Sequence, residues 1–534
     1  MATLVWAFLS AFIVWWHLHF GMIQYGGLDG GLLVNIAWQE YLGAEPYRDF
    51  FTPIDPLFVF PAGWAFELLG PTWHSLLVLI AFFSVATFTW AWLLLRKAGL
   101  NSIYSLALSF AIQAMTTMPF SWWWYNQVTS VVAAIFIGSS FLLLMQPRDP
   151  WARLSFWMAL FLLGLAKSNV AGPMLIVFLG ALLWEKTTRK FTLAATLTAG
   201  LAAVAFLGFH GISVPLLVNS YLILSDRLWT PQMWMGNFVA DINPWVNKIS
   251  FPCIALLLAA PLFMFLQMAK TRTEAIPLRA IFVLSFMTTL SSMIGLAVNR
   301  DLKMTDAARC LVAAEMMALF LQKTHAPIRL NIMRLVTVVA IVLTFTGLTI
   351  GALRVRVFSI GPGRYAEHTP LKTLSQPAFF QGMQVGPTFD ETIEDIATVL
   401  AGEGWPGNRH LKIFMGPRID CCYAAFDVPV EPGLAVFWEK IPSTHHGENI
   451  PDGDGEGIPE YQRRPSRWIQ DGEPLDPRVQ RFIDAKFDLC LFCLNFDGIP
   501  NLTLMPPDLR AELYAHYHVD YHRHIAVFRR IAGN

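Results

Sequence analysis

Long apolar runs occupy the first two thirds of the chain. About eleven of them are long enough, or nearly long enough, to cross a hydrocarbon core of ~30 Å. They cover residues 3–22, 74–95, 101–118, 127–146, 153–167, 169–185, 191–209, 249–269, 280–298, 307–322 and 335–353. The first run has no Lys or Arg before it and no obvious cleavage site, so we expect a retained helix. Residues 1–354 are therefore predicted to form a polytopic α-helical membrane domain.

The pattern changes after Arg354, because residues 355–534 are polar and lack any run that could span a membrane. Strands are predicted at Leu411–Met415, Leu434–Trp438, Phe487–Leu494 and Ile525–Phe528, and helices at Glu391–Ala401, Asp476–Ala485 and Pro507–His516. Strands that alternate with helical patterns indicate a small α/β domain. Residues 443–475, rich in Gly, Pro and charge, are expected to form a long irregular loop.

The composition supports a membrane location and argues against a nucleic-acid partner. Of 534 residues, 55% are hydrophobic and only 14% are charged, whereas soluble domains carry roughly 25% charged residues. The 20 Trp and 41 Phe suit a protein with wide interfacial surfaces. The formal net charge is zero, so nothing in the whole-chain charge indicates a nucleic-acid partner.

The distribution of Lys and Arg predicts the orientation of the helices. If the N-terminus lies inside, most of these residues fall in cytoplasmic turns, including Arg96, Lys97, Lys186, Arg189 and Lys190. Positive charge is enriched on the cytoplasmic side of membrane proteins. We therefore expect residues 355–534 to be periplasmic or extracellular, most simply at a bacterial inner (plasma) membrane.

The first outer loop, residues 24–73, has an unusual pattern. Glycines precede and follow Asp29, which predicts a turn that a substrate can approach closely. An amphipathic run, Leu32–Leu42, follows and is typical of a helix that lies in the membrane interface. Next come Pro46-Tyr-Arg-Asp-Phe-Phe51 and then Asp55-Pro-Leu57.

This arrangement resembles the first extracytoplasmic loop of the GT-C glycosyltransferases, and most closely that of the protein O-mannosyltransferase group (family 39) and its bacterial relatives. The resemblance covers residues 1–350 and implies a sugar donor linked to polyprenyl phosphate and an inverting transfer. The acceptor hydroxyl would belong to a protein, a lipid or a glycan. One departure is that Gly30 occupies the place where many relatives carry a second acid.

The resemblance assigns Asp29 as the catalytic base, because transfer to a hydroxyl requires a group that accepts its proton. Asp49 is a second candidate that could orient the surroundings of Asp29, or could simply pair with Arg48. Asp55 is expected to cap the turn that follows it.

A lipid-phosphate leaving group calls for cations on the outer side. Lys167 ends an apolar run, and the family carries a similar element here, although a lysine that only reaches toward the interface is the alternative. Further candidates for phosphate binding are Arg227, Arg300, Lys303 and Arg309, which could otherwise be ordinary surface charges.

Trp122-Trp-Trp124 precedes Tyr125 and Asn126 in the second outer loop. An interfacial aromatic belt explains these residues simply. Relatives often carry a Tyr-Asn pair here, which makes Tyr125 and Asn126 candidates for binding the sugar or the lipid.

The C-terminal part contains Cys421, Cys422, Cys490 and Cys493. Because disulfides persist in an oxidising compartment, we expect at least one of Cys421 and Cys422 to pair with Cys490 or Cys493. Its alternating histidines, from His516 to His524, indicate a solvated strand end more simply than a metal site. No cofactor motif is present, and a requirement for a divalent metal stays open.

Two other classes of function stay open. A transporter or flippase of lipid-linked sugars would need charges near the bilayer midplane and repeat symmetry, whereas the acids here are expected at the outer surface. A non-catalytic assembly protein with the same fold is compatible with Gly30 in place of a second acid.

Overall fold

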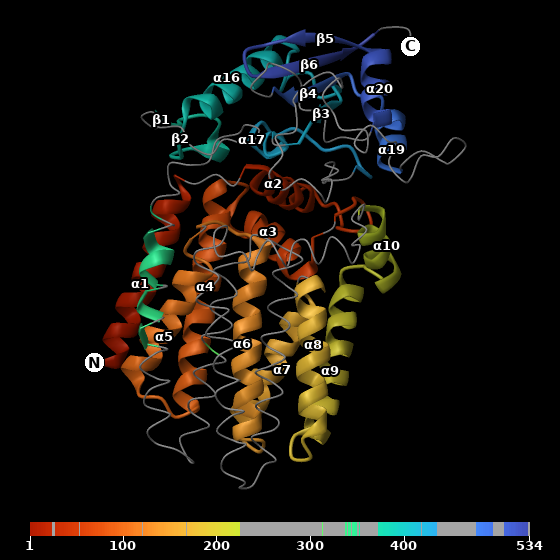
Figure 1. Ribbon diagram of the computed structural model, residues 1–534. Coiled ribbons are helices and arrows are strands. Elements are labelled where there is room, and N and C mark those ends of the chain that lie inside the picture. The colour runs from red at the N-terminus through yellow and green to blue at the C-terminus, as the bar shows by residue number, and fades with distance from the viewer. Residues whose placement is uncertain are drawn as a thin grey trace, which may run out of the picture.

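The polypeptide is divided between a bundle of long helices and a smaller part that contains a β-sheet (Figure 1). The computed structural model describes residues 1–23, 27–52, 54–119, 121–166, 168–224, 372–417, 419–434, 477–494 and 507–531, with single residues and short helical pieces between 312 and 352. The two parts meet at one end of the bundle (Figure 1).

Seven helices of the bundle coincide with the first seven predicted apolar runs. They are α1 (Ala2–Gly21), α4 (Trp73–Lys97), α5 (Ser102–Met115), α6 (Tyr125–Met145), α7 (Pro150–Gly164), α8 (Ser168–Trp184) and α9 (Arg189–Phe209). Among the described helices, α1, α4, α6 and α9 are long and apolar enough to cross a membrane. The chain is therefore a multi-pass integral membrane protein. Residues 249–269 and 280–298 lie outside the described residues, so the number of eleven spans stays a prediction.

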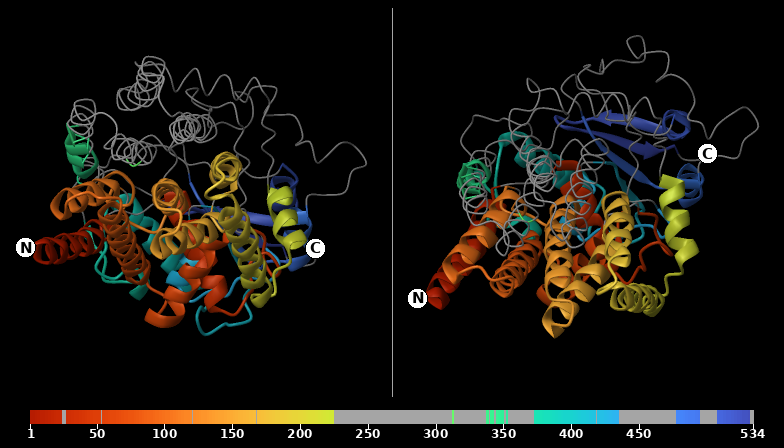
Figure 2. Two further views of the ribbon diagram at one scale, coloured as in Figure 1. Left: turned by 90° about the horizontal axis from the view of Figure 1, so that it is seen from below. Right: turned by 60° about the horizontal axis from the view of Figure 1, so that its bottom comes forward.

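The centre of the bundle is α6, which is buried along almost its whole length. Ser139 of α6 lies 2.7 Å from Ser155 of α7, and the indole of Trp90 on α4 donates to the same hydroxyl at 2.8 Å. Viewed from below, α1 lies at one end of the described helices and α9 toward the other (Figure 2). Near α1, the hydroxyl of Tyr104 lies 3.0 Å from that of Thr337, so helical residues from late in the chain pack beside α5.

The segment between α1 and α4 (the first loop) holds two helices, α2 (Gly27–Tyr41) and α3 (Pro56–Leu69). Both lie between the bundle and the sheet (Figure 1), and neither is among the four long apolar helices. Other elements of the protein cover α2, and its position at the membrane surface stays a prediction. Its residues with 3% exposure or less are Leu32, Leu33, Val34, Ile36, Ala37, Trp38 and Gln39.

The C-terminal part is built on a four-stranded mixed sheet in the order β3-β4-β6-β5. The strands are β3 (Ile413–Met415), β4 (Leu489–Cys493), β5 (Tyr517–Tyr521) and β6 (Ile525–Arg530), and only β3 and β4 are parallel. The helices are α16 (Pro387–Gly402), α17 (Cys422–Ala425), α19 (Pro477–Ala485) and α20 (Pro507–His516), and β1 (Lys372–Thr373) pairs with β2 (Gln384–Val385). The predicted α/β class is confirmed. Of the predicted strand Leu434–Trp438, Leu434 is not in a strand and the rest lies outside the described residues, as does the predicted loop 443–475.

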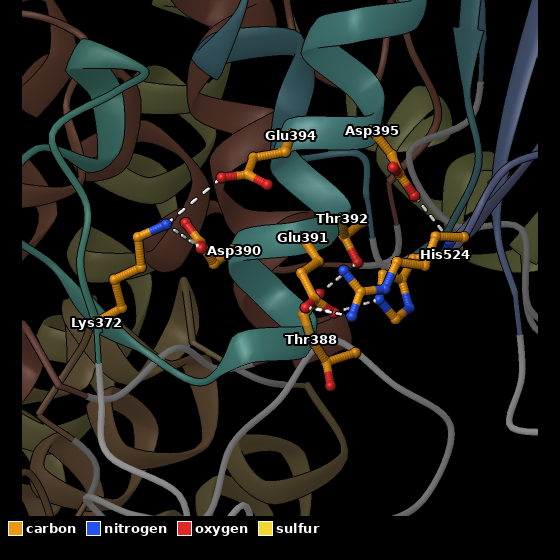
Figure 3. A network of polar contacts seen from close by, with 9 residues as sticks. Lys372, Thr388, Asp390, Glu391, Thr392, Glu394, Asp395 and His524 are labelled. Atoms are coloured by element: carbon orange, nitrogen blue, oxygen red, sulfur yellow. Dashed lines mark hydrogen bonds and ion pairs between the residues drawn. The ribbon is translucent and has the colours of Figure 1, made fainter.

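Ion pairs hold α16 against the turn between β5 and β6 (Figure 3). Glu391 contacts Arg523 at 2.5 Å and Nε2 of His524 at 2.7 Å. On another side of the helix, Lys372 lies 2.5 Å from the carboxylate of Asp390. The Glu391 contacts thus join α16 to the four-stranded sheet, and the Lys372 pair joins it to β1.

One hydrophobic core runs from the first loop into the C-terminal part. Residues of α2, α3 and α4 share this core with α16, α17 and the sheet. The ring of Phe66 on α3 meets the ring of Phe379 edge-on at 6.0 Å. The two parts of the chain are therefore packed together and not merely tethered.

Candidate functional site

Three segments that lie far apart in the sequence meet at the end of the bundle that faces the sheet. The backbone N–H of Leu57, at the start of α3, donates to the carbonyl of Leu165 in the α7–α8 turn at 2.9 Å. The N–H of Thr52 donates to the hydroxyl of Ser220 on α10 (Val214–Leu224) at 3.1 Å, and that hydroxyl donates back to the carbonyl of Thr52 at 3.0 Å. We call this meeting point, residues 45–57 with 164–166 and 211–220, the loop junction.

The Pro46–Phe51 segment folds into a tight turn within the loop junction. Tyr47 has a positive φ of 66°, which is rare for a non-glycine residue, and its side chain is buried. Its N–H donates to the carbonyl of Phe50 at 3.0 Å, and its hydroxyl donates to the carbonyl of Ile54. A buried residue held in this conformation is a candidate for a functional constraint.

The side chain of Asp49 makes contacts within this turn. Its carboxylate pairs with the Arg48 guanidinium at 2.9 Å and accepts the N–H of Glu45 at 2.8 Å. The hydrogen bond from Arg48 lowers the pKa of Asp49 below its usual range. Of the two roles that the sequence leaves open, pairing with Arg48 is the one that the geometry displays, and a catalytic role stays a prediction.

Asp29 is the third residue of α2, so the turn expected around it is helical. The glycines on either side do not break the helix, and this part of the prediction is wrong. Its role as a base stays a prediction. The predicted phosphate-binding residues Lys167, Arg227, Arg300, Lys303 and Arg309 lie outside the described residues.

The aromatic residues of the second loop are buried, which overturns the interpretation as an interfacial belt. Trp122, Trp123 and Trp124 are each exposed by 5% or less. The ring of Trp123 stacks on Phe58 of α3 at 5.7 Å, and its indole N–H donates to the Phe58 carbonyl at 2.9 Å. Tyr125 meets Phe58 edge-on at 5.7 Å, so the second loop buttresses the start of α3.

Asn126 is buried in the first turn of α6, beside the candidate residue Tyr125. Its carbonyl accepts the hydroxyl of Ser130 at 2.8 Å. The structure therefore brings Tyr125 close to the loop junction through Phe58, whereas a ligand role for Asn126 stays a prediction.

Glu40 is a buried acid that the sequence reasoning did not select. It lies against α3 at Gly63, where an added Cβ would stand 2.7 Å from its Cδ. Its Oε2 is shielded from solvent and has no hydrogen-bond partner among the described residues. Burial, reinforced by the charge of Glu67, raises the pKa of Glu40 well above its ordinary value. The sequence pattern could have predicted this burial, because Glu40 falls on the same helical face as Leu33, Ile36 and Ala37.

A buried phenol and a second buried carboxyl group lie near Glu40. Burial raises the pKa of Tyr47, and the charges of Asp55 and Glu40 raise it further. Asp55 precedes α3 as its N-cap residue, but its side chain makes no capping hydrogen bond, which corrects the simple capping role. Burial favours the protonated forms of Glu40 and Tyr47, so the first loop contains proton-bearing side chains at the Tyr47 turn.

The predicted disulfide is absent. The described cysteines Cys421, Cys422, Cys490 and Cys493 are free and buried. The Sγ atoms of Cys421 and Cys422 lie 3.9 Å apart, and the side chains pack in the hydrophobic core. Burial raises the pKa of the Cys422 and Cys490 thiols well above the usual value, so these groups are core residues and not reactive thiolates.

The histidines near the C-terminus contact carboxylates. Nε2 of His518 lies 3.2 Å from Asp520, and His516 lies 3.6 Å from Glu512. Among the described residues, no group of three or more His, Cys, Asp or Glu side chains is arranged to hold a metal ion.

Comparison with protein-family models finds no match, and comparison with curated protein sequences finds none either. Among solved structures, the chain is similar to the Archaeoglobus fulgidus oligosaccharyltransferase in its apo form, with a TM-score of 0.52 and 10% identity over 100% of this chain and 75% of that one. Two structures of ArnT from Cupriavidus metallidurans also align. The one bound to undecaprenyl phosphate has a TM-score of 0.44 and 12% identity over 99% of this chain and 98% of that one. The apo structure has a TM-score of 0.45 and 12% identity over 100% and 99%.

The likeness to the oligosaccharyltransferase defines the class of fold. The chain has a GT-C-like architecture, with a multi-span helical region followed by a mixed α/β domain. The expected fold is thereby confirmed as a GT-C-like architecture, whereas the number of spans and the protein O-mannosyltransferase group stay predictions.

Proposed function

We propose that this protein is a GT-C glycosyltransferase that moves a sugar from a polyprenyl-phosphate donor to an acceptor hydroxyl on the outer side of the membrane. The observation that carries the proposal is the GT-C-like fold over the whole chain. The loop junction supports it, because it joins the first loop to the turn that precedes Lys167. The start of α3 thus lies beside the residues that precede Lys167.

In the proposed reaction, the acceptor oxygen attacks the anomeric carbon from the side opposite the phosphate. The new carbon–oxygen bond forms as the bond to the phosphate oxygen breaks, and the phosphate leaves with that electron pair. Asp29 accepts the hydroxyl proton as the bond forms. The cations Lys167, Arg227, Arg300 and Lys303 would stabilise the leaving phosphate. Asp49 contributes indirectly, by bracing the turn through Arg48.

The test is transfer by the purified full-length chain in detergent, using a panel of polyprenyl-phosphate sugars and lipid, glycan and peptide acceptors. Replacing Asp29 by Asn preserves shape and removes the proton acceptor. We expect a loss of about 10²–10⁴-fold in turnover, the usual effect of removing a general base. Asp484→Asn is the matched control, because Asp484 is exposed on α19 and, among the described residues, accepts a hydrogen bond from Gln480.

Transfer by the wild type and by Asp484→Asn, with loss in Asp29→Asn, supports the proposal. Near-normal turnover in Asp29→Asn would remove Asp29 as the base. No transfer by the wild type with any donor in the panel would contradict the enzymatic proposal and favour a non-catalytic role.

A further inference from the structure

The C-terminal domain contacts the first loop through backbone hydrogen bonds at two places. The N–H of Gln384 donates to the carbonyl of Met22, directly after α1, at 2.8 Å. Between α2 and α3, the N–H of Gly433 donates to the carbonyl of Asp49 at 2.6 Å. Both bonds link residues that are more than 350 positions apart in the sequence, so they depend on the docking of the two parts.

A third contact lies between these two in the sequence, toward the C-terminal end of α2. The indole N–H of Trp38 donates to the carbonyl of Val428 at 2.8 Å, in a site where Trp38 is only 3% exposed. Val428 follows α17, and its own N–H donates to the carbonyl of Tyr423 at 2.8 Å. The acceptor is therefore held rigidly within the C-terminal domain.

The position of α2 depends on what covers it. A 15-residue helix that crosses no membrane is marginal by itself, and most of its stability must come from packing. It packs on α3 at Gly63 and against α17 of the C-terminal domain. Figure 1 shows α2 lying between these two elements. Its orientation is thus set from both sides.

We infer that the C-terminal domain is a clamp on the first loop and that Trp38 is its central positioning residue, holding α2 and hence Asp29 in the geometry needed for transfer. The second half of this inference rests on the proposed function. The first half, the ordering of α2 by the clamp, can be measured without any transfer assay.

The experiment compares Trp38→Phe with Trp405→Phe in the full-length protein. Trp405 is a close match, because its indole N–H donates at 2.9 Å to the carbonyl of Phe426, two residues before Val428. Both changes keep an aromatic ring and leave one carbonyl of the same loop without its indole donor. Only Trp38 lies on α2.

Hydrogen exchange of the α2 amides is the first readout. Because loss of a buried hydrogen bond weakens local stability, exchange in α2 should become about tenfold faster in Trp38→Phe and stay unchanged in Trp405→Phe. The second readout is transfer kinetics. In Trp38→Phe we expect kcat to fall by about 10-fold to 100-fold with KM unchanged, as for a misplaced catalytic group, and we expect Trp405→Phe to transfer normally.

Equal exchange in α2 for both variants would overturn the clamp. Faster exchange in Trp38→Phe with unchanged kcat would overturn the positioning role. If the wild type transfers no sugar, the proposed function fails, while the exchange data still decide whether the clamp exists.

Discussion

At the residue scale, Glu40 is the most unusual side chain of the first loop. Its carboxyl group lies against the backbone of α3 with Oε2 away from water. Burying a carboxylate is costly, so such a group takes up a proton instead. The fold thereby places a neutral acid in the last turn of the helix that carries Asp29 in its first turn.

Replacing Glu40 by Gln should change how stability depends on pH. The folded-state pKa of Glu40 is raised by burial, so its contribution is fully present below the unfolded value and is lost as pH rises through the raised value. Gln stays neutral, so the variant should lose less stability than the wild type as pH rises. Thermal unfolding across mildly acidic to alkaline pH measures this.

The control for this prediction is Glu394→Gln, because the Glu394 side chain is 64% exposed beside Lys372. It should keep the pH profile of the wild type. A Glu40→Gln profile that also follows the wild type would mean that Glu40 is charged in the folded protein.

At the scale of elements, the crossing of α2 over α3 depends on the absence of a side chain at Gly63. The close approach brings Glu40 and its flanking apolar residues onto α3. Pro61, inside α3, removes one backbone donor but does not end the helix. The two helices form a single layer that carries the Tyr47 turn at its edge.

Gly63→Ala should destabilise the protein by about 1–3 kcal/mol, because the added methyl group overlaps Glu40 and forces the helices apart. Gly200→Ala on α9 provides a control of opposite sign, since nothing lies within 4 Å of the added Cβ. There the helix should be stabilised by about 0.5–1 kcal/mol. Denaturation midpoints in detergent measure both, and equal effects would show that Gly63 has room for a side chain.

At the scale of the whole molecule, the sidedness of the membrane domain decides where the proposed chemistry takes place. The Lys and Arg distribution predicts that residues 355–534 lie outside. The shared core then places the first loop on the same side, because it packs directly on the C-terminal domain.

A reporter that is active only outside the cytoplasm, fused after Asn534, should therefore be active. A cytoplasmic reporter at the same position should be silent. Fusions after Lys97, at the opposite end of α4, should give the reverse pattern and serve as the control. Activity of only the cytoplasmic reporter at Asn534 would move the first loop, and Asp29 with it, to the inside.

The parts that the sequence predicts well are those determined by local patterns. The described apolar helices follow from hydropathy, and α20 begins and ends at the predicted residues, Pro507 and His516. The backbone structure around Asp29 was harder to predict, because glycines favour a turn locally while packing makes the segment helical. The burial of Trp38 was not predictable, since its cover comes from Val428, 390 residues later. The burial of the four free cysteines was not predictable for the same reason, because the residues that cover them are distant in the sequence.

That separation of 390 residues between Trp38 and Val428 also has a consequence for biosynthesis. At about 5–20 residues per second, translation reaches Val428 roughly 20–80 s after Trp38 has been made. During that interval the apolar face of α2 has lost contact with the ribosome but has not yet met α17. A nascent chain of this protein thus exposes the uncovered hydrophobic residues of α2 beside the membrane until α17 has been made.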